Sequence, residues 1–139
     1  MRIIPVAQAD TAPSTIVHIP DLDAVIAGDV AYNGIHPWLA FTDHGKRMQW
    51  IASIGQVEAL NPRIVVAGHK RPGAPDDDPA AILGGTKTYL RDFEQALSES
   101  RSAQGLVDKM MAVHGDLGNP YTLWTAAQAV FEQSQGASS

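Results

Sequence analysis

Two strongly apolar, β-branched segments, each ending at a glycine, constrain the fold of this chain more than any other feature. They cover residues 23–27 and residues 63–67 of the 139-residue sequence. Between them, residues 44–60 place apolar side chains at helical spacing and stop before an Asn-Pro pair, where helices commonly end. Strand, helix and strand in this order predict one crossover unit, which is typical of an α/β fold.

Further elements surround this unit. The three aspartates of residues 76–78 are followed by a proline, and we interpret them as the start of a helix and not as a metal site. The other strands are predicted over residues 2–6 and 15–19, and the other helices over residues 79–98, 103–114 and 120–133. Together these elements fit a single domain of residues 1–139.

The composition excludes several classes of function. Fifteen acidic against ten basic residues give a net charge of −5, which argues against nucleic acid or an anionic membrane as the partner. The absence of cysteine excludes a disulfide framework, a zinc–thiolate site and a cysteine nucleophile. No apolar run approaches the length of a membrane span, and the first residues make a poor signal peptide. These features predict a soluble, cytoplasmic protein.

The side chains that follow the two glycines are the best candidates for chemistry. Asp29 and His69 each come directly after an apolar strand and its glycine. Ligand sites in α/β proteins gather at the carboxyl ends of strands, and a carboxylate with an imidazole suits a divalent metal such as zinc, manganese or iron. From the spacing alone, the simpler alternative is that Asp29 lies in a turn and His69 in an ordinary loop.

The same residues carry a resemblance to a known family. Residues 15–33, which end in Ala-Gly-Asp-Val-Ala-Tyr-Asn, and residues 67–72, Ala-Gly-His-Lys-Arg-Pro, resemble the C-terminal half of metallo-β-lactamase-fold hydrolases. The resemblance covers roughly residues 6–95. It implies half of a four-layer αββα sandwich, in which Asp29 is the aspartate that bridges two metals and His69 binds the second metal.

On this interpretation the chain is a metallo-β-lactamase-like second half, residues 1–100, with a mixed sheet and covering helices, followed by a C-terminal helical extension, residues 101–139. The sequence departs from the family in two ways. None of its five histidines forms the family's His-x-His-x-Asp-His cluster, and Gln8 stands where the next histidine ligand is expected. Only Asp29 and His69 remain of the family's ligands, so zinc, manganese or iron is expected to bind weakly or not at all.

A metal site that performs chemistry needs about three protein ligands, so this set has to be completed from elsewhere. The sources left open are a second chain, His36, Asp10 or the aspartates of residues 76–78. The loop that holds His36 borders the substrate pocket in the resembling family, so His36 is a candidate for substrate contact, together with Asn33 and Lys70. For His36 the simpler alternative is packing beside a tryptophan, and for Lys70 a solvated turn.

Half a sandwich leaves one face of its sheet uncovered. The two central strands are apolar on both faces, whereas helices of this chain can cover only one face. Because soluble monomers rarely expose a large apolar patch, we expect a homodimer or higher homo-oligomer in which two sheets bury each other. The alternative is that the helices predicted over residues 103–114 and 120–133 fold back over the open face.

Two functions of different classes follow. The first is a metal-dependent hydrolase of ester, amide or thioester bonds in a small-molecule substrate, weak or inactive as a single chain because most metal ligands are missing. The second is a non-catalytic, oligomeric binding module, or a truncated remnant of the family, that keeps the fold without the chemistry. No serine-hydrolase motif, phosphate loop or dinucleotide fingerprint supports another class.

Overall fold

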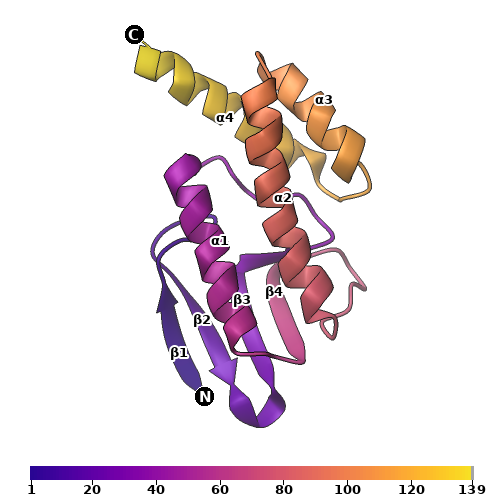
Figure 1. The fold of residues 1–139 in the computed structure, drawn as a ribbon. Coiled ribbons are helices and arrows are strands. Elements are labelled where there is room, and N and C mark those ends of the chain that lie inside the picture. The colour runs from indigo at the N-terminus through magenta and orange to yellow at the C-terminus, as the bar shows by residue number, and fades with distance from the viewer. Residues whose placement is uncertain (139) are drawn as a thin grey trace.

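A mixed four-stranded sheet forms one layer of the computed structural model, which describes the backbone of residues 1–138 and the side chains of residues 1–132 (Figure 1). Its strands lie side by side in sequence order and are β1 (Arg2–Val6), β2 (Ser14–Ile19), β3 (Ala24–Asn33) and β4 (Ile64–Lys70). The first three strands pair antiparallel, whereas β3 and β4 pair parallel. A parallel pair needs a crossover connection, and here it is a helix, so the predicted crossover unit and α/β class are confirmed.

Four helices complete the described part of the chain. They are α1 (His44–Ala59), α2 (Pro79–Glu99), α3 (Ala103–His114) and α4 (Pro120–Ser138), and a 3-10 turn, Pro20–Leu22, joins β2 to β3. The side chains of Asp43 and Asp78 cap α1 and α2 by accepting hydrogen bonds from backbone N–H groups of the first turn. The helix start predicted at the acidic run is therefore confirmed, while Ser139, the last residue of the predicted extension, lies outside the described residues.

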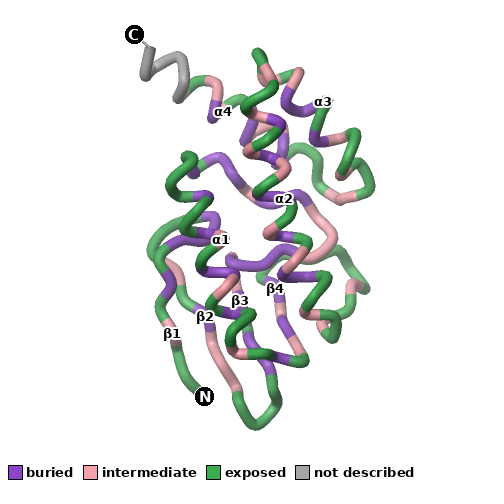
Figure 2. The backbone as a smooth tube through the Cα atoms, viewed as in Figure 1, coloured by how far each residue is buried: buried purple, intermediate pink, exposed green. Residues whose placement is uncertain are grey.

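The core lies between the sheet and the two helices that cover one of its faces, α1 and α2, and it continues between α2, α3 and α4 (Figures 1 and 2). Val25 and Val65 are register partners on the parallel strands, and both are fully buried. Trp50 of α1 is also fully buried, and its indole N–H donates a 2.9 Å hydrogen bond to the carbonyl of Val30. This bond fixes α1 to the half of β3 that carries the candidate residues.

β3 and β4 both continue beyond the glycines at which the sequence pattern ended them. β3 runs on to Asn33 and β4 to Lys70, so Asp29 and His69 are strand residues and do not lie in a turn or a loop. Gly28 explains why the sequence pattern ended β3 too early. Its φ of +53° and the register shift beside it bend the strand without ending it.

The two glycines let the strands approach each other closely. A Cβ atom on Gly68 would lie 2.6 Å from the backbone carbonyl of Gly28, which is closer than real Cβ contacts come. Only a residue without a side chain therefore fits at this position while β4 stays beside β3. The close approach carries the next residue of each strand to the same edge of the sheet.

The opposite face of the sheet carries no helix among the described residues. α3 and α4 pack against each other, and α3 packs against α2 at the end remote from the strands (Figure 1). The alternative that these helices fold back over the open face is therefore wrong. No helix within the described part of the chain combines the length and the apolarity that crossing a bilayer requires.

Candidate metal-binding site

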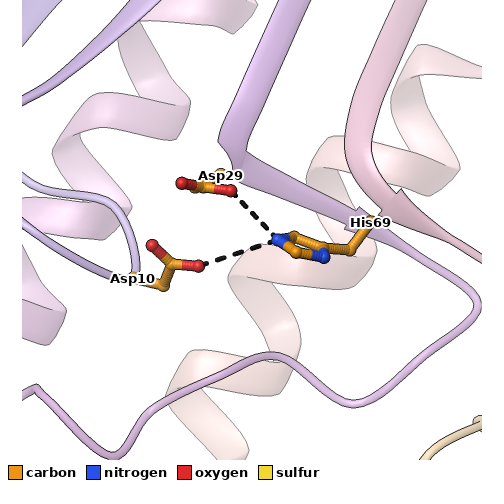
Figure 3. Close-up of side chains that lie close together, drawn as sticks. All are labelled: Asp10, Asp29 and His69. Carbon is orange, nitrogen blue, oxygen red and sulfur yellow. Dashed lines mark hydrogen bonds and ion pairs between the residues drawn. The ribbon is translucent and has the colours of Figure 1, made fainter.

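Asp10, Asp29 and His69 form a cluster at one edge of the sheet, and Figure 3 shows their polar atoms turned toward one another. The Nε2 atom of His69 lies 3.0 Å from Asp29 Oδ1 and 4.0 Å from Asp10 Oδ2. One ligand atom of each residue lies within 4.8 Å of the other two. Three separate segments of the chain thus direct a possible metal ligand toward one point.

The parallel pairing of β3 and β4 brings Asp29 and His69 together. Tyr32 of β3 is the register partner of His69, and its ring stacks on the imidazole with the centroids 4.7 Å apart. Asp29 follows the bulge at Gly28 and turns toward the same imidazole. The two side chains meet at one sheet edge, as the sequence led us to expect, and their role as metal ligands stays a prediction.

Asp10 joins the cluster from the loop between β1 and β2. Because β1 runs in the same direction as β3 and β4, this loop lies at the edge where those strands end. Gln8, which the resemblance places at a ligand position, donates a 2.8 Å hydrogen bond from its side-chain amide to the carbonyl of Ala9. Of the additional ligands left open by the sequence, only Asp10 belongs to this cluster of described residues.

Tyr32 holds the carboxylate of Asp10 in place. Its hydroxyl donates a 2.7 Å hydrogen bond to Asp10 Oδ2, and both residues are buried. Burial raises the pKa of Asp10 above its usual value, although the hydrogen bond from Tyr32 opposes the rise. Burial also raises the pKa of Tyr32, and the hydrogen bond to Asp10 raises it further, so the phenol stays protonated and remains a donor.

A hollow of about 280 Å³ opens beside the cluster. It is lined by the two cluster residues Asp10 and His69, by Tyr32, and by residues of later segments, namely Ile35, His36, Trp38, Asn119, Tyr121 and Thr122. A second, mostly apolar hollow of about 320 Å³ shares Tyr32 and Ile35 with the first and is otherwise lined largely by α2. The first hollow is large enough to place a small molecule next to the cluster.

The three predicted substrate contacts lie in different places. His36 lines the hollow beside the cluster. Asn33 lines the second hollow and donates a 2.8 Å hydrogen bond to the carbonyl of Pro75, whereas Lys70 forms a 3.1 Å ion pair with Asp76. Asn33 and Lys70 thus hold the loop between β4 and α2, and substrate contact stays a prediction for all three residues.

The donor set of the cluster fits a divalent cation. Two carboxylates and one imidazole are ligands that zinc, manganese and iron all accept. The imidazole nitrogen that faces both carboxylates is Nε2, so the atom that now bonds to Asp29 is also the one available to a metal. The side chains of His69 and Asp29 are 46% and 45% exposed, so solvent reaches the point where the three groups converge.

Comparison with known families gives a match over about the first half of the chain. The model of the metallo-beta-lactamase superfamily matches residues 3–69. This stretch ends at His69 and includes all three cluster residues, while α2, α3 and α4 lie beyond it. No curated protein matches the chain.

Proposed function

Residues 3–69 belong to the metallo-beta-lactamase superfamily, and on this premise we propose that the protein is a weak metal-dependent hydrolase. Its cation is zinc, manganese or iron, held by Asp10, Asp29 and His69. The observation that carries the proposal is the convergence of these three side chains, with one ligand atom of each within 4.8 Å of the others.

When bound, the cation would lower the pKa of a water molecule and polarise the carbonyl of an ester, amide or thioester. Residues of the chain orient the ligands and the substrate around it. The hydroxyl of Tyr32 fixes Asp10 through the 2.7 Å hydrogen bond, and its ring fixes the plane of the His69 imidazole. The hollow beside the cluster holds the small-molecule substrate, and the half-exposed side chains of Asp29 and His69 leave a path for water.

The composition of the ligand set is the reason for weak binding. Three protein ligands meet the minimum of a catalytic metal site, but only one of them is an imidazole. Asp29 and His69 are also half exposed, so water competes with them for the cation. A single chain should therefore hold the metal loosely and hydrolyse its substrate slowly.

Isothermal titration of the purified chain with zinc and with manganese tests the proposal. We expect about one ion per chain, and a roughly tenfold or larger loss of affinity in Asp10→Ala, Asp29→Ala and His69→Ala, since each change removes a ligand. The matched control is Asp77→Ala, which removes an exposed carboxylate outside the cluster and should leave the affinity unchanged.

Two results would overturn the proposal. One is an ion that binds equally well to all three cluster variants, because the site would then lie elsewhere. The other is no uptake of either metal by the unaltered chain, which would favour the non-catalytic binding module instead.

We also infer that the chain associates with a second copy of itself through the open face of its sheet. The support is a row of apolar residues that crosses all four strands on that face: Ile3, Val17, Ile26 and Val66. Ile3 is 69% exposed and Ile26 is 42% exposed, which is unusual for large apolar residues inside strands.

A further inference from the structure

His36 is a fully buried histidine with one nitrogen that lacks a partner. It lies in the loop after β3, where its backbone N–H donates a 2.9 Å hydrogen bond to the carbonyl of Gly118. Its Nδ1 atom lies 2.8 Å from the hydroxyl of Tyr89 on α2. Its Nε2 atom is buried and has no hydrogen-bond partner among the described residues.

The contact with Tyr89 assigns the proton on the imidazole. The Tyr89 hydroxyl is buried and has no hydrogen-bond partner among the described residues other than His36 Nδ1, so the phenol O–H donates a hydrogen bond to this nitrogen. Burial lowers the pKa of His36, which keeps the imidazole neutral near pH 7. In the neutral ring, Nε2 therefore carries the hydrogen and is a donor without an acceptor.

An unpaired buried donor costs free energy, and nearly all such groups in native proteins find a partner. His36 is among the residues that line the hollow beside Asp10 and His69. Since Nε2 itself is buried, an acceptor held in this hollow reaches it after a small shift of the surrounding side chains. No lysine or arginine of the described part of the chain lines the hollow, and Asp10 does. The lining therefore disfavours an anion and favours an uncharged acceptor.

We propose that the Nε2–H group of His36 binds the carbonyl oxygen of an uncharged substrate in the hollow beside the Asp10–Asp29–His69 cluster. The inference rests on the proposed hydrolase function and names the chemistry of its substrate. Apolar and aromatic side chains of the lining, Ile35, Trp38 and Tyr121, accept the substrate's hydrocarbon part.

The C-terminal extension positions this donor. Gly118 holds the loop of His36 through the backbone hydrogen bond, and a parallel β-bridge joins Gly118 to Ile35. Asn119, Tyr121 and Thr122 complete the wall of the hollow. These extension residues lie outside residues 3–69, so the wall of the hollow is built partly by the stretch that the superfamily model matches and partly by residues beyond it.

A pair of probes that differ only in the acceptor oxygen tests the proposal. The probes are 4-nitroacetophenone, which has a ketone oxygen, and 1-ethyl-4-nitrobenzene, which is of similar size and has a CH₂ group in place of the carbonyl. Binding of each to the full chain is measured by NMR titration without added metal. We expect the ketone to bind about three- to tenfold more tightly, which corresponds to one neutral hydrogen bond.

Two substitutions of His36 separate the donor from the packing. His36→Gln places an amide N–H near the position of Nε2 and should retain the preference for the ketone. His36→Asn keeps a polar group only near Nδ1, toward Tyr89, and should bind the two probes equally. An unchanged preference in His36→Asn, no preference in the unaltered chain, or no binding of either probe would each overturn the proposal.

The ring nitrogens give a second measurement that needs no variant. Two-bond ¹H–¹⁵N NMR spectra of the unaltered chain should show His36 as the neutral tautomer with hydrogen on Nε2. Hydrogen on Nδ1 would overturn the assignment and with it the proposal. Both measurements omit metal, so their failure is distinct from a failure of the metal titration, which would overturn the hydrolase function and leave the donor intact.

Discussion

At the scale of single residues, Tyr32 links the parts of the site. Its hydroxyl holds Asp10 of the β1–β2 loop, and its ring stacks on His69 of β4. Its backbone N–H donates a 3.1 Å hydrogen bond to the hydroxyl of Thr86 on α2. One strand residue thus fixes a loop, a neighbouring strand and a helix relative to each other.

Tyr32→Phe should lower the free energy of unfolding by about 2 kcal/mol, because the buried carboxylate of Asp10 loses a charge-assisted hydrogen bond. Urea denaturation at neutral pH measures the change. Tyr121→Phe is the matched control, since Tyr121 is 73% exposed, and the same loss of a hydroxyl there should cost no more than about 0.5 kcal/mol. Equal stability of the two variants would contradict the role of Tyr32.

The sequence predicted two residues of the cluster and left the third open. Asp29 and His69 follow similar apolar strands, and adjacent parallel strands end at one edge, so their proximity could be inferred. Asp10 could not be chosen among the alternatives, because its position depends on how β1 pairs with β2. The sequence nevertheless held a signal that points to Asp10 as the third residue. Asp10 is the only ionisable residue of residues 7–13, and a hairpin of β1 and β2 places this loop at the same edge of the sheet.

At the scale of elements, the close approach of β3 and β4 at their glycines determines whether the cluster forms. Gly68→Ala should destabilise the protein by about 1–3 kcal/mol, because its Cβ would lie 2.6 Å from the backbone of Gly28 and push the strands apart. The same change should also weaken metal binding by moving His69 away from Asp29. Thermal unfolding and metal titration measure the two effects.

Gly55→Ala on α1 is the control for this substitution. A Cβ at Gly55 meets no atom within 4 Å, so the change should stabilise the helix by up to about 1 kcal/mol. If Gly68→Ala were as stable as Gly55→Ala and bound metal normally, the close approach of the two strands would not matter for the site.

α1 and α2 are joined by an ion pair that makes stability depend on pH. The guanidinium of Arg47, only 3% exposed, donates to the carboxylate of Glu94, and His44 lies 2.8 Å from the other oxygen. Burial alone would raise the pKa of Glu94, but the hydrogen bonds and charges of Arg47 and His44 lower it overall. The pair therefore contributes its full stability above the unfolded pKa of a glutamate and loses it as the pH falls through the lower folded value.

Glu94→Gln should cost about 2–4 kcal/mol at neutral pH, because Arg47 is left buried without its counter-charge. The difference from the unaltered chain should shrink as the pH falls from about 6 to about 3, since Glu94 becomes protonated there. Urea denaturation across this range measures both. Glu99→Gln, which removes half of an exposed 3.7 Å pair with Lys109, should change stability by less than about 1 kcal/mol at any of these pH values.

The ends of helices were more predictable than the ends of strands. Asp43, Asp78 and Ser102 cap their helices with their own side chains, and such local hydrogen bonds follow directly from the sequence. A strand ends where pairing with its neighbour ends, which is a property of the sheet. The glycines of β3 and β4 looked like ends because glycine commonly breaks strands, whereas here they permit a bulge and a close contact.

At the scale of the whole molecule, the described helices cover one face of the sheet and leave the other face open. The residues of the apolar row occupy the same face because register partners in adjacent strands point the same way. α3 and α4 extend the molecule beyond the end of the sheet and leave this face open (Figure 1). A two-fold partner of the same kind would bury the row of one chain against the row of the other.

Ile26→Lys tests this association, because it places a charge in the middle of the apolar row where a second sheet would pack. Light scattering of the unaltered chain should give twice the mass of one chain, and Ile26→Lys should give the mass of a single chain. Met48→Lys is the matched control: Met48 is 38% exposed, close to the 42% of Ile26, but lies on α1, which covers the other face. A charge at that position should leave the dimer intact, since it lies outside the proposed interface. A single-chain mass for the unaltered protein, or dissociation by both substitutions alike, would show that the open face does not bind a second copy.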